Sequence, residues 1–353
     1  MPTYIFGIAL LSAFVIAYFS MPLVIKLAFK IGATDQPDPR KVHVKIMPRL
    51  GGLAIFLAFL IPMLFIIDKE GPFLGVMIGA LVIFVVGILD DIYQLSAGIK
   101  LLGQIIAAGI AIYFGVMVHF VTNPFDGLLS LGLLSIPVTF LWIVGVTNAI
   151  NLIDGLDGLA GGVSAIAAAT MGMVALLQGQ VEVSLAAFVL VAAILGFLPY
   201  NFHPAKTFMG DSGSNLLGFI LGCLAIMGTA KSATIISLFV PIVILGIPIF
   251  DTFFAIIRRI NNKAPIFKPD KDHLHHRLLA LGMSHTRCVL TIYAISGVFA
   301  GVAVALSLTT NPKAMLVLAI LLFLVVLGAD KIGLLTGGKA PAVPVYNTVK
   351  REM

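Results

Sequence analysis

Long apolar stretches separated by short polar connections fill most of the 353-residue chain. LVIFVVGIL (81–89) and SLAAFVLVAAILGFL (184–198) are apolar at consecutive positions, whereas the strands of a membrane β-barrel alternate apolar and polar residues. Because a helix needs about 20 apolar residues to cross a bilayer, the pattern predicts an all-α bundle of about ten to eleven transmembrane helices. The expected spans are approximately 4–29, 50–67, 73–89, 99–118, 131–149, 159–178, 183–200, 214–229, 233–256, 288–309 and 313–329.

The composition agrees with a polytopic membrane protein. Hydrophobic residues make up 60% of the chain and charged residues 11%, against about 25% charged in soluble domains. These values exclude a soluble globular enzyme, a disordered chain and a coiled coil, and two cysteines exclude a disulfide scaffold. We expect one transmembrane catalytic domain over residues 1–330, followed by a flexible cytoplasmic tail over 331–353, which is rich in Gly, Pro and charge.

The basic residues are distributed unequally between the two ends of the expected spans. Of the 22 Lys and Arg residues, three (Lys69, Lys231 and Lys313) lie at one set of ends and the other 19 lie at the opposite set. The positive-inside rule then predicts that the N-terminus is outside and the C-terminus inside. Topology explains the net charge of +6 without nucleic acid, and the basic inner surface suits anionic phosphates.

Carboxylates gather where apolar spans are expected to enter the cytoplasm. A carboxylate at membrane depth costs a few kcal/mol unless it is paired or solvated. Several groups at one depth therefore predict a shared polar cavity, while the alternative is a set of separate helix caps at the interface. The residues concerned are Asp90, Asp91, Asp154, Asp157, Asp211 and Asp251.

Two of these motifs carry more specific signals. Asn151, Asp154 and Asp157 recur at intervals of three and would share one face of a helical turn, where they could hold a metal ion or bind a sugar and a base. The alternative is a Gly-rich loop with Asx turns. Asp211 opens a span after Phe208-Met-Gly, where a helix N-terminus favours phosphate and a bridging magnesium ion; a plain helix cap is the alternative.

The longest inner loop carries His273, His275, His276 and Arg277. A zinc site lacks the further ligands that would complete it. Histidines beside an arginine can instead clamp phosphate, while a solvated polar loop is the alternative.

On these motifs the chain resembles the polyprenyl-phosphate N-acetylhexosamine-1-phosphate transferases, integral membrane enzymes that start cell-envelope polymers. The resemblance covers roughly residues 20–310, and within the family it is strongest to the Gram-positive branch that initiates wall teichoic acid. Leu274 interrupts the three-histidine run of the peptidoglycan branch, which argues against a muramyl-pentapeptide substrate. The matching motifs are DQPDPRKVHVKIMPRLGG (35–52), GILDD (87–91), NAINLIDGLDGLAGG (148–162), YNFHPAKTFMGDSGS (200–214), PIFDTFFAIIRR (248–259) and HLHHRL (273–278).

The resemblance implies a reaction at the cytoplasmic face of the cell membrane. Undecaprenyl phosphate would attack the β-phosphorus of UDP-N-acetylglucosamine, releasing UMP and forming a lipid diphospho-sugar. The expected partners are these two substrates, membrane lipid and a second copy in a homodimer, with Mg²⁺, or alternatively Mn²⁺, as the cofactor.

The resemblance also assigns roles by motif. Asp211 matches the magnesium ligand, and Asp90 and Asp91 match a pair of which the first is proposed to deprotonate the lipid phosphate. The sequence leaves open which of the two is the base. The other matches are Asp154 and Asp157 near the nucleotide, Lys100 as the active-site lysine, and His273, His275 and His276 at the pyrophosphate. Asn151, Phe208 and Arg277, which stand in the same motifs, are further expected substrate contacts.

Rivals from other classes predict different features. An ion-coupled transporter would place carboxylates near the midplane of the bilayer within inverted repeats, and no repeat is evident. An intramembrane prenyltransferase would need another Asp shortly after Asp91, where the chain has Gln94. A structural scaffold leaves the polar groups at membrane depth unexplained.

Overall fold

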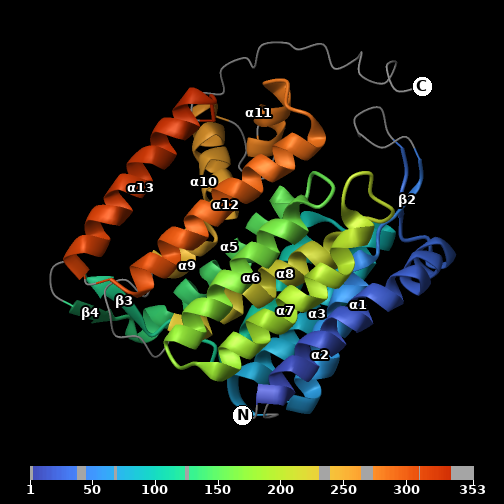
Figure 1. The fold of residues 1–353 in the computed structure, drawn as a ribbon, viewed down its shortest axis with the longest axis horizontal. Coiled ribbons are helices and arrows are strands. Elements are labelled where there is room, and N and C mark those ends of the chain that lie inside the picture. The colour runs from blue at the N-terminus through green and yellow to red at the C-terminus, as the bar shows by residue number, and fades with distance from the viewer. Residues whose placement is uncertain are drawn as a thin grey trace.

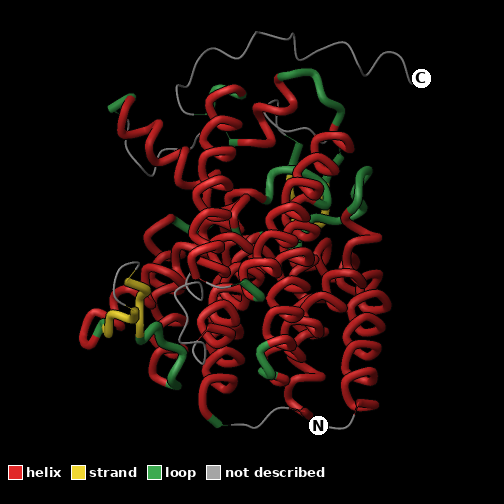
Figure 2. Tube along the Cα trace, turned by 60° about the vertical axis from the view of Figure 1, so that its left-hand side comes forward, coloured by secondary structure: helices red, strands yellow, loops and turns green. Residues whose placement is uncertain are grey.

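A computed structural model describes residues 3–37, 45–66, 70–123, 127–229, 239–263, 273–309 and 311–334. It is a bundle of helices that lie side by side, with the N-terminus at one end (Figures 1 and 2). The helices are α1 (Thr3–Ile31), α2 (Gly51–Ile66), α3 (Gly71–Tyr93), α4 (Ala97–Tyr113), α5 (Ser135–Ile153), α6 (Leu159–Leu177), α7 (Val181–Asn201), α8 (Asp211–Thr229), α9 (Phe239–Ile244), α10 (Gly246–Asn261), α11 (Leu274–Ala280), α12 (His285–Ser307) and α13 (Asn311–Lys331).

The prediction of an all-α polytopic membrane protein is confirmed. Within the described ranges, eight helices are long and apolar enough to cross a membrane, and α2 and α4 are shorter apolar helices. Two short antiparallel strand pairs accompany the helices: β1 (Thr34–Asp35) with β2 (Met47–Pro48), and β3 (Phe120–Asn123) with β4 (Gly127–Ser130). The sequence did not predict either pair.

The expected span over 233–256 is wrong as one continuous helix. Residues 230–238 lie outside the described part, α9 ends at Ile244, and α10 begins at Gly246. Pro248 explains the break, because it has no N–H to donate to the carbonyl of Ile244 and its ring would clash there in an unbroken helix. The expected tail falls mostly on residues 335–353, which also lie outside the described part.

Helix α8 is the centre of the bundle. Of the residues in its apolar segment, 89% are buried, whereas the corresponding share for α13 is 11%. In Figure 1, α13 leans away from the other helices. Glycines allow the neighbours to approach closely: a Cβ on Gly52 of α2 would overlap the backbone of Gly213, and one on Gly87 of α3 would overlap Ser212. This packing brings α2 and α3 against the first turn of α8.

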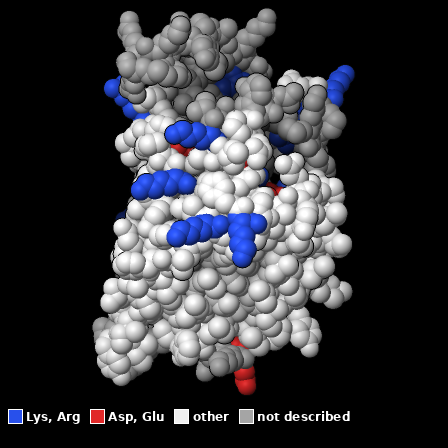
Figure 3. Space-filling view, turned by 90° about the vertical axis from the view of Figure 1, so that its right-hand side faces the viewer, with Lys and Arg blue, Asp and Glu red and all other residues white. Residues whose placement is uncertain are grey.

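Charged side chains are unevenly placed on the face in Figure 3. Lysines and arginines gather in the upper half, while an acidic side chain marks the lower end. In this orientation the end with the N-terminus points down, as in Figure 1.

Candidate active site

The buried end of α3 meets the first turn of α8 through Asp91. Its Oδ1 accepts a hydrogen bond from the backbone N–H of Asp211 (2.7 Å), and its Oδ2 accepts one from that of Ser212 (3.0 Å). The Asp91 side chain has no exposed surface. Asp91 therefore caps α8, and two of the amides that the sequence offered to a phosphate are already occupied.

Asp90, the other member of the pair, has a different environment. The ammonium Nζ of Lys100 on α4 lies 3.0 Å from Asp90 Oδ2 and 3.0 Å from Asp211 Oδ2. The Lys100 side chain is 30% exposed, whereas those of Asp90 and Asp211 are 7% and 12% exposed. Lys100 thus joins two carboxylates that are far apart in sequence and leaves the group accessible from one side.

Arg49, just before α2, is a residue that the sequence did not indicate as part of the site. Its Nη2 donates to Asp211 Oδ1 at 2.6 Å, and its Nε lies 3.1 Å from Asp91 Oδ1. Burial alone would lower the pKa of the guanidinium, but the carboxylates of Asp211 and Asp91 raise it. In the sequence Arg49 carried no signal beyond its charge, because its partners lie 42 and 162 residues further along the chain.

Backbone bonds hold the segment of Arg49 beside the entrance to α8. Phe208 N–H donates to the carbonyl of Pro48 (2.8 Å), and Gly51 N–H donates to that of Phe208 (3.0 Å). Phe208, a predicted substrate contact, is half-buried at this junction. Gly210 follows with φ of +77°, a left-handed conformation that places its backbone against the Asp91 carboxylate.

Amide side chains support the same helical turn. Asn151 Nδ2 donates to Ser214 Oγ (2.8 Å) and to Asp211 Oδ1 (3.3 Å). Deeper in the bundle, Gln104 Nε2 donates to Asn215 Oδ1 at 3.1 Å. We conclude that Asn151 orients Asp211 in this structure.

Asp154 follows α5 directly and lies near the same cluster. Its burial, followed by the negative charge of Asp211, raises the pKa of Asp154 to about 7. Asp154 is therefore a group that can change its protonation near neutral pH.

Asp157 does not join the Asp211 group. Its Oδ2 lies 2.9 Å from His203 Nδ1 and accepts a hydrogen bond from the N–H of Ala205 (3.1 Å). The backbone N–H of Asp157 donates to His285 Nε2 (3.2 Å). His203 and His285 were not predicted as site residues, because each is a lone histidine within its own segment.

The histidine motif is held by Asp251 of α10. His273 Nδ1 lies 2.8 Å from Asp251 Oδ2, and the N–H of Leu274 donates to Asp251 Oδ1 (2.7 Å). Asp251 thus positions the start of α11 and does not lie in the carboxylate cluster. His276 is exposed on α11, whereas Arg277 is buried.

His275 connects α11 to the loop that carries Asp154. Its Nε2 is buried and has no hydrogen-bond partner among the described residues, and a Cβ on Gly155 would collide with its ring. Burial, followed by repulsion from His276, lowers the pKa of His275 to about 3, so the ring is neutral at pH 7. The structure therefore brings the Asp154 and histidine motifs together through Gly155.

The residues around Asp211 fit a magnesium ion. Magnesium binds one or two carboxylates together with phosphates and water, and Asp90 and Asp211 present two carboxylates that already share the cation of Lys100. Within the described ranges a different group, Asp157 with His203 and His285, offers three ligand atoms that lie within 4.8 Å of one another.

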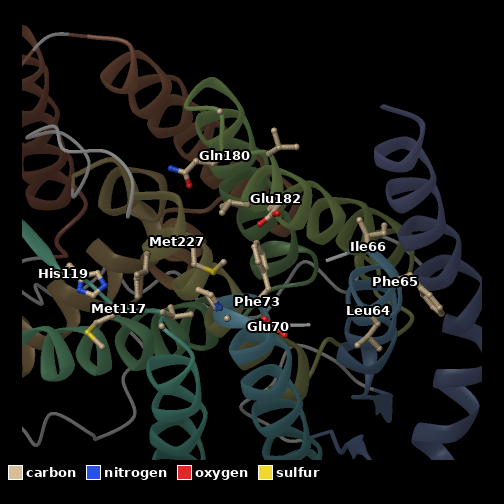
Figure 4. Close-up of a pocket in the computed structure, with 18 residues that line it drawn as sticks. Leu64, Phe65, Ile66, Glu70, Phe73, Met117, His119, Gln180, Glu182 and Met227 are labelled. Carbon is tan, nitrogen blue, oxygen red and sulfur yellow. The ribbon is translucent and has the colours of Figure 1, made fainter. Parts of the chain in front are cut away.

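A pocket of about 1350 Å³ lies at the other end of the bundle (Figure 4). Glu70, Phe73, His119 and Glu182 are among the residues that line it. Asp90 lies 20 residues beyond Glu70 along α3, which corresponds to about 30 Å of helix. This pocket is therefore remote from the cluster around Asp211.

Comparisons with known proteins identify the family of the chain. The sequence model of the family described as Glycosyl transferase family 4 matches residues 73–229. The chain is 47% identical over 350 residues to a probable undecaprenyl-phosphate N-acetylglucosaminyl 1-phosphate transferase of Bacillus subtilis, covering 98% of this chain and 97% of that protein.

More distant relatives carry similar names. A decaprenyl-phosphate N-acetylglucosaminephosphotransferase of Mycobacterium leprae is 37% identical, over 86% of this chain and 84% of its own. An undecaprenyl-phosphate alpha-N-acetylglucosaminyl 1-phosphate transferase of Salmonella typhi is 30% identical, over 84% and 82%. The expected family is confirmed: the chain is a multi-pass membrane protein that belongs to glycosyl transferase family 4.

Proposed function

We propose that the protein transfers N-acetylglucosamine 1-phosphate from UDP-N-acetylglucosamine to undecaprenyl phosphate, with release of UMP. The observation that carries the proposal is the cluster of Arg49, Asp90, Lys100 and Asp211 at one end of the bundle. The near full-length similarity to the Bacillus subtilis transferase supports the choice of sugar and lipid.

The cluster suits phosphoryl transfer between two anionic substrates. Such transfer depends mainly on positioning and on neutralising the charge of the phosphates. Arg49 and Lys100 supply two fixed cations beside Asp211. A magnesium ion, with manganese as the alternative, would be held by Asp211 and would add positive charge at the phosphates.

The contacts favour Asp90 over Asp91 as the base that takes a proton from the lipid phosphate. Both oxygens of Asp91 accept backbone hydrogen bonds from α8, so its role is to hold Asp211 in place. Asp90 instead contacts the ammonium of Lys100 through Oδ2, and Lys100 is the partly exposed member of the cluster. We assign Asp154 and His275 to the nucleotide end of the donor, because Asp154 interacts with the charge of Asp211 and His275 packs against Gly155 in the same loop.

The product assay tests the function directly. Purified protein given undecaprenyl phosphate, Mg²⁺ and UDP-N-acetylglucosamine should release UMP and form a lipid diphospho-sugar. UDP-N-acetylmuramyl-pentapeptide should be a poor donor, because Leu274 interrupts the histidine run. Release of UDP in place of UMP would mean transfer of the sugar alone and would refute the proposal.

The proposal places the cluster at the cytoplasmic face of a Gram-positive cell membrane, with residues 1–330 as one catalytic domain. A reporter fused at Tyr346 should be active on the cytoplasmic side, and one at Asp126 on the outer side, because 19 of 22 basic residues lie at the inner ends. Reporter activity on the opposite sides would contradict the predicted orientation of the helices in the membrane. The homodimer stays a prediction, which chemical cross-linking in membranes can check.

Gly155→Ala should weaken the contact between α11 and the Asp154 loop. The new Cβ would overlap the ring of His275, and overpacking of this kind costs about 1–3 kcal/mol. We expect a lower melting temperature and a higher KM for the nucleotide sugar. Gly145→Ala on α5 is the matched control, because a Cβ there meets nothing within 4 Å. An equal effect of both changes would contradict the proposed contact.

A further inference from the structure

Asp157, His203 and His285 form a compact group, here called the imidazole–carboxylate cluster. One ligand atom from each side chain lies within 4.8 Å of the others. The rings of His203 and His285 are stacked, with centroids 4.2 Å apart and planes 23° apart. The cluster has no part in the roles assigned above to Arg49, Asp90, Lys100 and Asp211.

Its three residues come from three separate parts of the chain. Asp157 lies in the loop between α5 and α6, His203 follows α7, and His285 is the first residue of α12. Asn201 braces the same junction, because its Oδ1 accepts from Gly158 N–H (3.0 Å) and its Nδ2 donates to the carbonyl of Thr207 (3.0 Å). The backbone that carries these ligand residues is therefore held by hydrogen bonds, which lowers the entropic cost of ordering the side chains around a ligand.

The donor chemistry selects a class of ion. Two imidazoles and one carboxylate suit zinc and neighbouring transition metals, whereas magnesium prefers oxygen ligands and water. Zinc binds imidazole nitrogen at about 2.0–2.1 Å, so small side-chain movements would bring three ligands around one ion. His203 is exposed, which gives the ion a path from solvent and a free coordination position.

We propose that the imidazole–carboxylate cluster binds a divalent transition-metal ion of the zinc type, separately from the magnesium site proposed at Asp211. On binding, the ion takes the place of the contact between His203 and Asp157 and of the hydrogen bond from Asp157 N–H to His285. The bound ion then links the loop that carries Asp157 to the start of α12 through its bonds to Asp157 and His285.

Such an ion also acts on the neighbouring site. Asp157 is two residues from Gly155, which packs against His275, and three residues from Asp154. An ion that ligates the Asp157 carboxylate adds positive charge to the loop that carries Asp154 and changes the position of that loop, so it lowers the rate of transfer. This second step rests on the proposed function, whereas the binding step does not.

Cobalt(II) titration of the full-length protein, without a histidine tag and without nucleotide, tests the binding step. We expect one saturable cobalt site with the visible absorption of a low-coordinate ion, retained in excess Mg²⁺ and lost on addition of Zn²⁺. His203→Ala and His285→Ala should each remove it. His276→Ala, which deletes an exposed imidazole on α11, should retain it.

Melting curves of each variant establish that it is folded, and the exposed position of His203 makes His203→Ala the variant least able to disturb packing. Absence of saturable cobalt absorption in the parent protein would overturn the proposal. So would a signal that persists in folded His203→Ala or disappears in His276→Ala.

The inhibition step is tested by UMP release in saturating Mg²⁺ with added Zn²⁺. Zinc should lower the rate of UMP release by the parent protein at least tenfold relative to the zinc-free reaction. The rate of the His203→Ala variant should fall far less on addition of zinc. Equal zinc sensitivity of both would overturn the inhibitory role. A protein that binds cobalt as expected but releases no UMP would refute the proposed function and leave the metal site in place.

Discussion

Asp211→Asn should reduce phosphosugar transfer by about a thousandfold while the protein still folds. Asp211 is the only residue in the described cluster whose carboxylate contacts both Arg49 and Lys100. Asn keeps the shape of the side chain but removes its negative charge, so both the magnesium ion and the two cations lose their shared partner. The fold should survive, because Arg49 remains paired with Asp91 and Lys100 with Asp90.

Initial rates of UMP release across a range of Mg²⁺ concentrations measure this effect. The residual activity of Asp211→Asn should require more magnesium than that of the parent protein. Asp330→Asn is the control, since this carboxylate is exposed near the end of α13. Near-normal turnover of Asp211→Asn with an unchanged magnesium requirement would remove Asp211 from the metal role.

The membrane spans could be predicted from sequence because their signal is local. Each apolar run is long enough by itself to specify a helix in lipid. The break between α9 and α10 was missed because hydropathy does not register that Pro248 lacks an N–H. The β3–β4 pair was missed because its strands are only four residues long.

The site could be predicted only in part, because many of its contacts join residues that are distant in the chain. Asp90 and Asp211 were singled out because carboxylates at membrane depth are rare, and Lys100 because it matches the family's active-site lysine. Arg49, His203 and His285 lie in polar segments, where a charged or titratable residue is ordinary, and their partners are distant in the chain.

Spacing also cannot reveal how a carboxylate is used. Asp90 and Asp91 are adjacent, yet the turn of α3 directs one toward Lys100 and the other toward the backbone of α8. Asp154 and Asp157 are three residues apart, yet the loop sends Asp157 to His203. Only the arrangement of helices in space separates these roles.

Arg49→Ala should reduce both stability and turnover, and it is the strongest test of a residue that the sequence did not indicate. The guanidinium bridges Asp91, whose side chain is fully buried, and Asp211. Removing one partner of a fully buried ion pair costs about 3–5 kcal/mol. Because the Arg49 side chain is 28% exposed, water screens part of this loss, and about 2 kcal/mol is expected.

Arg49→Lys separates charge from geometry. Lysine restores one positive charge, but a single ammonium cannot reproduce the fork through which Nε reaches Asp91 and Nη2 reaches Asp211. We therefore expect the melting temperature to recover in part, while UMP release stays about tenfold or more below that of the parent protein. Lys206→Ala, which removes an exposed cation in the segment just after α7, is the control for loss of positive charge alone. Full recovery of turnover by Arg49→Lys would show that Arg49 contributes charge alone, and the bridging role inferred from its two contacts would be wrong.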